Sequence, residues 1–438
     1  MRKYIITVLL FGVLSFVFIA MYKTEMQPVE SLMRPPVYEN AQGGLGKILN
    51  ETIGEDSVLK SVAYNDSKSA IIYEDIDGDT TKEAIVFAQN DSEAGQVTMY
   101  LFEKKDDEWF LFDKTDNTAF DLQKLEIADM NSDGVCEIII GFFSRPDNTG
   151  KMLKIFSSDK ASNKLNMLFQ SEYTVFNCID INLDGRKDVF TISPNDVNFN
   201  TFDASFLVYD DIIKKVGSVK VNTMVSSVLS VNYDNFGNSL RVFIDGVSSD
   251  GLLITEVLQW KKELKILEHI MFNNDSICQL SKRESNISST DVNGDGLLEI
   301  PFQISADKDS VPVINWVFLS GNEITTVGYM LDNSNQGFYF KLPQLWLDSI
   351  TTIITDNGAS LKFYALNSNK EIDISRPILE IKTTDSSSRN PTTKSYKLLN
   401  KGLNHTYYYK LFDDALIFNV NEKTLQDNMI FELKGCFE

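Results

Sequence analysis

The chain has 438 residues, of which 43% are hydrophobic, 11% aromatic and 24% charged. This apolar content is sufficient for a large hydrophobic core and excludes an intrinsically disordered chain. The formal net charge of −21 would repel nucleic-acid phosphates and favours the capture of cations. We therefore exclude nucleic acid as a partner.

The N-terminus has the pattern of a membrane-targeting segment. Arg2 and Lys3 precede an uncharged, mostly apolar run over residues 4–22. As a helix this run would span about 28 Å, close to the thickness of the hydrocarbon layer of a membrane. Because basic residues keep the short N-terminal side in the cytoplasm, we expect residues 1–23 to be an uncleaved signal anchor with the bulk of the chain extracytoplasmic, at the cell surface. The alternative is a cleaved signal sequence and a secreted protein.

Residues 24–54 separate this segment from the rest of the chain. They include Pro28, Pro35 and Pro36 and show little hydrophobic periodicity up to residue 45. This composition predicts a juxtamembrane linker.

The cysteine and histidine content excludes several kinds of site. The four cysteines have no CxxC spacing, which indicates neither a zinc site nor a disulfide framework. We interpret the two histidines, His269 and His405, as structural residues. The chain has no Gly-x-Ser-x-Gly or HExxH motif and no pair of acidic residues that indicates catalysis outside the loops described next.

A nine-residue acidic motif occurs four times in the sequence. Each copy has Asp at position 1, Asp or Asn at position 3, Asp at position 5, and Asp or Glu at position 9. We name the copies loop 1 (75–83), loop 2 (129–137), loop 3 (180–188) and loop 5 (291–299), and a weaker copy over 232–237 loop 4. Loop 4 has phenylalanine at position 5 and lacks the later ligands. First positions are 54, 51 and 111 residues apart, so the last interval corresponds to two periods.

Apolar stretches of strand length flank the loops. They precede the loops at 69–73, 125–128, 175–179 and 228–231 and follow them at 84–87, 138–142, 189–192 and 300–304. Further pairs lie at 97–102 and 109–112, 152–156 and 165–169, 252–260 and 264–271, and 313–319 and 324–330. Four strands in about 52 residues is typical of a β-propeller blade, so we predict an all-β chain with propeller repeats over residues 55–333. A β-sandwich would not require an acidic loop that returns once in each period.

The last hundred residues lack the acidic loop. We predict strands at 345–354, 361–366, 378–381, 407–412 and 415–420 and a short helix within 423–433. Residues 334–438 are expected to form a small β-rich or α+β module, or alternatively degenerate blades that close the propeller.

The residue types in the loops suit calcium, Ca2+. This cation takes six to eight oxygen ligands at about 2.4 Å, and alternate residues of a tight loop can direct oxygens to one point. Positions 1, 3, 5 and 9 would supply side-chain oxygens and position 7 a backbone carbonyl, while glycine at position 6 permits the sharp turn. The predicted ligands are Asp129, Asn131, Asp133 and Glu137 in loop 2; Asp180, Asn182, Asp184 and Asp188 in loop 3; Asp291, Asn293, Asp295 and Glu299 in loop 5; and Asp75, Asp77, Asp79 and Glu83 in loop 1, where Thr80 replaces the glycine.

These loops, of the form DxDxDGxx[DE], resemble those of the FG-GAP or VCBS-like repeats of integrin α-chain propellers and of many bacterial surface proteins. The resemblance covers residues 55–333. It implies a calcium-binding β-propeller whose ligands are the residues named above.

The sequence is compatible with two functions. We expect a non-catalytic module that binds or scaffolds a protein or a carbohydrate. The alternative is an extracellular polysaccharide hydrolase or lyase with carboxylates assembled in space.

Overall fold

The computed structural model describes residues 44–53, 57–65, 67–90, 96–115, 119–147, 150–195, 201–305, 311–321, 323–386 and 395–437. The predicted signal anchor and residues 24–43 of the predicted linker lie outside these ranges. Among the helices of the described ranges, none combines the length and the apolar character needed to cross a membrane.

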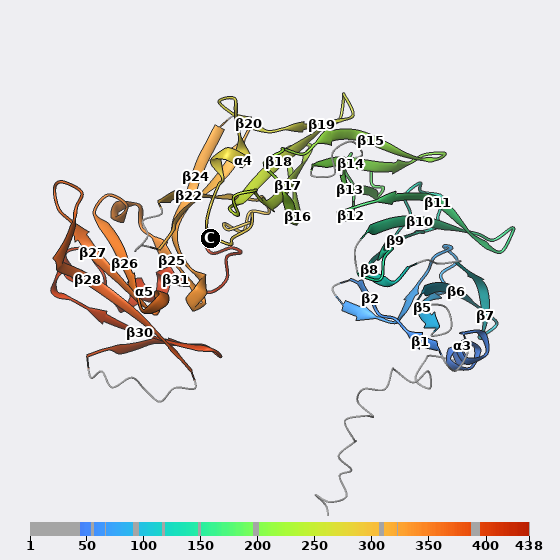
Figure 1. Cartoon of the computed structure of the whole chain (residues 1–438), viewed down its shortest axis with the longest axis horizontal. Coiled ribbons are helices and arrows are strands. Elements are labelled where there is room, and N and C mark those ends of the chain that lie inside the picture. The colour runs from blue at the N-terminus through green and yellow to red at the C-terminus, as the bar shows by residue number, and fades with distance from the viewer. Residues whose placement is uncertain are drawn as a thin grey trace, which may run out of the picture. The chain divides into compact units, whose positions relative to one another are not determined.

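The chain divides into two compact units. Unit 1 comprises Met1–Ile127 and Gly134–Gln170, and unit 2 comprises Ala128–Asp133 and Ser171–Glu438. Both units consist mainly of β-sheets in which strands adjacent in sequence pair with each other (Figure 1). The prediction of an all-β chain is therefore confirmed.

Unit 1 contains two sheets. The first sheet consists of β1 (Ser57–Leu59), β4 (Ile71–Glu74), β5 (Glu83–Asn90), β6 (Val97–Lys105) and β7 (Glu108–Lys114). The second consists of β2 (Val62–Tyr64), β3 (Ser67–Ser69), β8 (Asp121–Ala128), β9 (Glu137–Phe143), β10 (Lys151–Asp159) and β11 (Lys164–Glu172). Each sheet includes a meander of four consecutive strands, β4–β7 and β8–β11.

Helix α3 (Leu45–Ile53) precedes these sheets and lies within the predicted linker. Its residues Leu45 and Leu49 are fully buried and pack in one cluster with Phe102 and Trp109. The apolar residues recur every four positions, which is the period of a helix with one buried face. This part of the predicted linker is therefore a packed element of unit 1.

Unit 2 continues the series of meanders. One sheet consists of β12 (Val175–Ile179), β13 (Asp188–Pro194), β14 (Phe202–Tyr209) and β15 (Ile213–Lys220), and the next of β16 (Ser227–Phe236), β17 (Ser239–Val247), β18 (Leu253–Lys261) and β19 (Ile266–His269). The hairpin of β20 (Met271–Phe272) and β21 (Asp275–Ser276) and the short helix α4 (Ile277–Leu280) follow. All pairings within the two meanders are antiparallel.

Two five-stranded sheets complete unit 2. The first consists of β22 (Ile300–Ser305), β23 (Val313–Ser320), β24 (Glu323–Asn333), β25 (Phe338–Leu342) and β31 (Met429–Ile430). The second consists of β26 (Ile350–Thr355), β27 (Ser360–Leu366), β28 (Ile372–Asp385), β30 (His405–Leu411) and β29 (Lys397–Lys401). The connecting 3-10 helices and the last α-helix are η4 (Ser334–Gln336), η5 (Gln344–Trp346), η6 (Asp356–Gly358), η7 (Asp413–Leu416) and α5 (Glu422–Asn428).

The strands predicted beside the loops and in the second pairs are confirmed, with four differences elsewhere. The pair β14 and β15 was not predicted, because β15 is half exposed and contains Lys214, Lys215 and Gly217. The predicted strand at 415–420 is wrong, because Asp413 and Asp414 begin η7 instead. The start of the predicted strand at 345–354 is η5, and the predicted C-terminal helix ends at residue 428.

The exposure of a strand depends on its position within the meander. The second strands β9, β13 and β17 are buried on both faces, whereas the fourth strands β11 and β15 are largely exposed. Neighbouring sheets within a unit pack face to face, as the Phe206 and Trp260 rings do at 5.6 Å between centroids. Strands buried on both faces require the continuous apolar runs seen in the sequence.

Candidate metal centres

Loops 1, 2 and 3 connect the first and second strands of their meanders. Their position-9 acids, Glu83, Glu137 and Asp188, are the first residues of β5, β9 and β13. In loop 5, Glu299 pairs with Thr290 through an isolated antiparallel bridge directly before β22. The strand pairs therefore fix both ends of each loop.

The backbone of all four loops has positive φ at positions 4 and 6. These residues are Gly78 and Thr80 in loop 1, Ser132 and Gly134 in loop 2, Leu183 and Gly185 in loop 3, and Gly294 and Gly296 in loop 5. The sequence predicted the turn at position 6 but not the one at position 4. Glycine adopts this backbone conformation without steric cost, whereas the β-branched Thr80 at φ 74° is strained.

Replacing Thr80 with glycine is expected to stabilise the protein by about 1 kcal/mol, because it removes the left-handed strain of a β-branched residue. The measurement is urea unfolding in the presence of a chelator. Thr81→Gly is the matched control, because Thr81 does not have positive φ. A Thr80→Gly protein no more stable than the wild type would contradict the strain argument.

Hydrogen bonds to backbone N–H groups hold the side chains at positions 1 and 3. In loop 5, Asp291 accepts the N–H groups of Gly294 and Gly296 at 2.8 and 2.9 Å. Asn293 Oδ1 accepts the N–H of Asp295 at 3.1 Å. In loops 1 and 3, position 1 likewise accepts two N–H groups and position 3 accepts the N–H of position 5. Such bonds also form in ordinary Asx turns, so they do not by themselves indicate a metal.

The acid at position 9 distinguishes these loops from ordinary turns. Glu83, Asp188 and Glu299 are 3%, 2% and 0% exposed, and one oxygen of each accepts the N–H of position 2, at 2.7, 3.3 and 2.9 Å respectively. The Oε1 atoms of Glu83 and Glu299 are buried and have no hydrogen-bond partner among the described residues. A buried carboxylate oxygen without a partner costs free energy, and a bound cation would remove that cost.

Burial raises the pKa of Glu83, Asp188 and Glu299 to about 7, and the other carboxylates of each loop add to the rise. The buried acids therefore bind protons more tightly in the folded chain than in the unfolded chain. Protons and a metal ion would compete for the same oxygens.

We expect the metal-free protein to lose stability as the pH rises from about 5 to 8. The stability contributed by an acid with a raised pKa is complete below its unfolded pKa, about 4, and is lost as the pH rises through the folded value of about 7. Calcium should abolish this loss because it binds the ionised carboxylates. Urea unfolding in chelator and in calcium across this range provides the measurement, and a metal-free stability that rises over the same range would refute the assignment.

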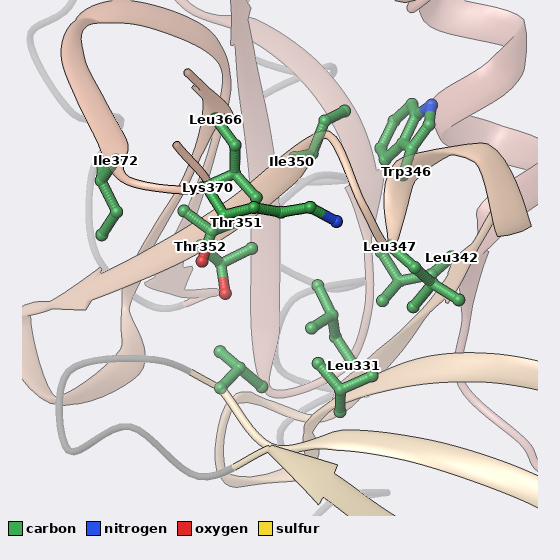
Figure 2. A pocket seen from close by; sticks show the side chains of 12 residues that line it. Leu331, Leu342, Trp346, Leu347, Ile350, Thr351, Thr352, Leu366, Lys370 and Ile372 are labelled. Carbon is green, nitrogen blue, oxygen red and sulfur yellow. The ribbon is translucent and has the colours of Figure 1, made fainter. Parts of the chain in front are cut away.

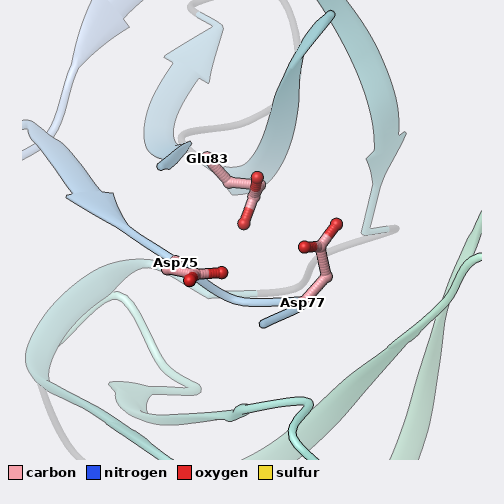
Figure 3. A group of neighbouring side chains, drawn as sticks. All are labelled: Asp75, Asp77 and Glu83. Atoms are coloured by element: carbon pink, nitrogen blue, oxygen red, sulfur yellow. The ribbon is translucent and has the colours of Figure 1, made fainter. Parts of the chain in front are cut away.

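Loop 1 brings three carboxylates together. Oxygens of Asp75, Asp77 and Glu83 all lie within 4.8 Å of one another, and Figure 3 shows the three side chains pointing toward a common space. Among the described residues, no other group of three His, Cys, Asp or Glu side chains is gathered as closely. Position 3 of loops 2, 3 and 5 is asparagine, so an amide oxygen would supply the corresponding ligand there.

Basic side chains contact two of the loops. Lys160 Nζ lies 2.7 Å from Asp77 Oδ2 and 3.9 Å from Asp79 Oδ2 of loop 1. In loop 3, the Arg186 guanidinium at position 7 donates to Asp184 Oδ2 at 2.9 Å. These cations compensate part of the negative charge of the loops.

Loop 2 shows local geometry like that of loop 5. Asp129 Oδ1 accepts the Ser132 N–H at 2.6 Å, and Asn131 Oδ1 accepts the Asp133 N–H at 3.1 Å. The Asn131 amide donates to Asp133 Oδ2 at 2.9 Å, as the Asn293 amide donates to Asp295 in loop 5. Glu137 at position 9 is fully buried.

Loop 4 is not a loop in the structure. β16 runs through it, and Gly237 and Asn238 form a two-residue turn to β17. Asp234 is buried and forms an ion pair with Arg241, whose Nε donates to Asp234 Oδ1 at 2.7 Å. The buried Arg241 guanidinium therefore neutralises Asp234, the acid of loop 4.

The donor set of loops 1 and 5 fits calcium. Each offers side-chain oxygens at positions 1, 3, 5 and 9, and an unpartnered buried oxygen at position 9. Hard oxygen ligands from a flexible loop suit Ca2+ better than Mg2+, which demands near-ideal octahedral geometry. Calcium bound there would neutralise the carboxylates and connect position 9 to the turn.

A cluster around Glu256, which is buried in β18, was not predicted from the sequence. His269 Nδ1 lies 2.6 Å from Glu256 Oε1, and Cys278 Sγ donates to Glu256 Oε2 at 3.4 Å. Burial and the adjacent Glu256 carboxylate raise the pKa of the Cys278 thiol above the range of a nucleophile. We interpret the cluster as structural, in agreement with the sequence-based interpretation of His269.

A cavity of about 250 Å³ lies between the two five-stranded sheets of unit 2 (Figure 2). Its lining is mainly apolar and includes Leu331, Trp346 and Ile350, with Lys370 as the charged residue. None of the described residues that line the cavity is acidic. The cavity therefore lacks the paired carboxylates that glycoside hydrolysis uses.

Comparisons with known proteins identify no family. No family model matches the sequence, and no curated protein matches it. Among solved structures, the β-propeller domain of the Trilobed protease from Pyrococcus furiosus is 8% identical, with a TM-score of 0.28 over 74% of this chain and 90% of that chain.

Two other similar structures come from different classes of protein. A hypothetical selenium-binding protein from Sulfolobus tokodaii is 10% identical, with a TM-score of 0.29 over 67% of this chain and 75% of that chain. A family 117 glycoside hydrolase produced by Zobellia galactanivorans is 11% identical, with a TM-score of 0.26 over 59% of this chain and 82% of that chain. These TM-scores are too low to assign a function.

Proposed function

We propose that the chain is a calcium-binding β-propeller of the FG-GAP or VCBS type that binds or scaffolds a protein or a carbohydrate. Consecutive four-stranded meanders with an acidic loop after the first strand support this fold. The observation that carries the proposal is the buried acid at position 9, which in loops 1 and 5 has an oxygen without a hydrogen-bond partner among the described residues. An ordinary turn does not require such an acid.

The charge distribution supports a role for cations. Residues 334–438 contain twelve basic and twelve acidic residues, so the net charge of −21 resides in residues 1–333. Loops 1, 2, 3 and 5 all lie in this acidic part of the chain. A partner that contacts the repeats should be neutral, basic or bound through calcium.

We place the module outside the cytoplasmic membrane, anchored by residues 1–23 or secreted after cleavage. The apolar run at 4–22 with Arg2 and Lys3 before it supports the anchor. Calcium concentrations outside cells also suit modules that bind the ion weakly, with dissociation constants on the order of 10⁻⁴–10⁻³ M.

The full-length protein is expected to fractionate with membranes, because the apolar run at 4–22 is long enough to remain in the bilayer. Cell fractionation with an antibody against the C-terminal region provides the measurement. A mature chain free in the medium, with its N-terminus beyond Ala20, would instead show that the segment is a cleaved signal.

A capture experiment tests the proposed function. The immobilised protein is exposed to a glycan array and to extracellular protein fractions, with calcium and with a chelator. A partner retained in calcium and lost in both chelator and an Asp295→Asn variant would support a calcium-dependent binding module. Turnover of a polysaccharide by the wild-type protein would contradict it and favour a hydrolase or lyase.

A further inference from the structure

The contact between Lys160 and loop 1 joins two elements that are distant in sequence. Lys160 lies at the turn between β10 and β11, and its ammonium group contacts Asp77 at 2.7 Å. The Asp77 side chain is 6% exposed, whereas that of Lys160 is 47% exposed. The acid is therefore held in place, while the lysine reaches it from the solvent side.

The number of acidic ligands in loop 1 is consistent with its contact to Lys160. The four predicted ligands of loop 1 are all acidic, whereas those of loop 5 are three acids and Asn293. The four predicted ligands of loop 1 and the Lys160 ammonium together carry the same formal charge as the ligands of loop 5. The loop with one additional carboxylate is thus the loop that a lysine contacts.

Arg241 in β17, which pairs with Asp234 of loop 4, provides an internal comparison. Its side chain is 1% exposed and packs on the rings of Phe236 and Phe318, at 4.9 and 5.0 Å from their centroids. Its Nη1 also donates to the Leu319 carbonyl at 2.6 Å. The guanidinium is thus a permanent cation, whereas the exposed and flexible Lys160 can leave its acid by changing rotamer.

The turn that carries Lys160 is held by its own hydrogen bonds. Asp159 accepts the N–H of Ala161 at 2.9 Å and the hydroxyl of Ser162 at 2.7 Å. Loss of the contact with Asp77 would therefore free the lysine side chain without unfolding the turn.

We propose that Lys160 is a tethered cation that competes with a metal ion for loop 1, so that metal binding at this loop releases the lysine to solvent. The inference rests on the proposed calcium function. Independent support for a cation at this loop comes from Glu83. One of its carboxylate oxygens lies within 4.8 Å of oxygens of Asp75 and Asp77, and its buried Oε1 has no hydrogen-bond partner among the described residues. A calcium ion bound through Asp77 and Asp79 would repel the ammonium at this distance.

Calcium should therefore expose the Lys160 amine. The full-length protein is acetylated briefly with acetic anhydride at fixed ionic strength, in calcium or in chelator, and modification at each lysine is measured by mass spectrometry. Labelling of Lys160 is expected to rise about threefold to fivefold in calcium, since the surface ion pair that is lost contributes on the order of 1 kcal/mol at most. Lys164 on the same hairpin serves as the internal control and should not change. Equal labelling of Lys160 in both conditions would overturn the proposal.

Calcium affinity gives a second readout. Isothermal titration with CaCl2 is expected to show one site whose dissociation constant falls roughly threefold to tenfold in Lys160→Gln relative to Lys164→Gln, because the competing charge is removed. In a double-mutant cycle, the gain in calcium affinity from Lys160→Gln should disappear when Asp77→Asn is also present, because the charge that Lys160 contacts is then absent. If the wild type binds calcium but the two lysine variants are equal, this inference fails alone. If no variant binds calcium, the proposed function fails as well.

Discussion

Removing calcium is expected to lower the melting temperature of the protein by several degrees for each site that empties. Without metal, loops 3 and 5 each hold three carboxylates and loop 1 holds four, with the position-9 acid buried. A ligand at 100 times its dissociation constant contributes about 2.7 kcal/mol for each site if the unfolded chain does not bind it. In a chain of 438 residues that corresponds to about 3 °C for each site.

Thermal melts in calcium, in chelator and in magnesium provide this measurement. Magnesium should restore the melting temperature poorly, because it requires octahedral geometry that an irregular loop does not offer. Asp295→Asn should reduce the stabilisation by calcium, whereas Asp275→Asn, which removes an exposed acid outside the loops, should leave it intact. A melting curve that is identical in chelator and in calcium would mean that the loops are turns and not metal sites.

Replacing Arg241 with methionine is expected to destabilise the protein by about 3–5 kcal/mol, because it leaves a buried charge without a partner. The Asp234 carboxylate would lose the guanidinium, and it also accepts the Leu298 N–H at 2.8 Å directly before Glu299 of loop 5. The change should therefore weaken calcium binding at loop 5 in addition to folding. Urea unfolding and calcium titration of the same variant measure both effects.

The double variant Arg241→Met with Asp234→Leu is the matched control. Replacing a buried ion pair by apolar groups of similar volume is often neutral, so the double variant should recover much of the lost stability. If Arg241→Met alone unfolds within 1 kcal/mol of the wild type, the pair is not the buried structural cation described here.

The repeats of the fold were predictable because two sequence patterns recur together: the acidic positions of the loops and the apolar runs of the buried strands. A cation loop requires oxygens at alternate positions, so positions 1, 3, 5 and 9 recur in the sequence wherever the loop recurs. Strands buried on both faces, such as β9 and β13, require continuous apolar runs next to the loops. Local residue patterns of this kind also predicted the ends of the loops, where Glu83 and Asp188 begin their strands.

The remaining features depend on contacts between distant residues. No local pattern indicates that Lys160 reaches Asp77, or that the isolated Arg241 neutralises Asp234, because each contact depends on the packing of neighbouring strands. The exposed strand β15 was missed because an outer strand needs few apolar residues. Its three lysines and Gly217 resemble a loop when the segment is read alone.

Calcium coordination at loop 5 tests the central claim most directly. Crystals grown in calcium, measured for anomalous scattering, are expected to show a peak at about 2.3–2.6 Å from oxygens of Asp291, Asn293, Asp295 and Glu299. The Oε1 atom of Glu299, which has no hydrogen-bond partner among the described residues, should be one of the ligands. A well-ordered loop 5 with no anomalous peak, and with its acids bonded only to backbone N–H groups, would contradict the account.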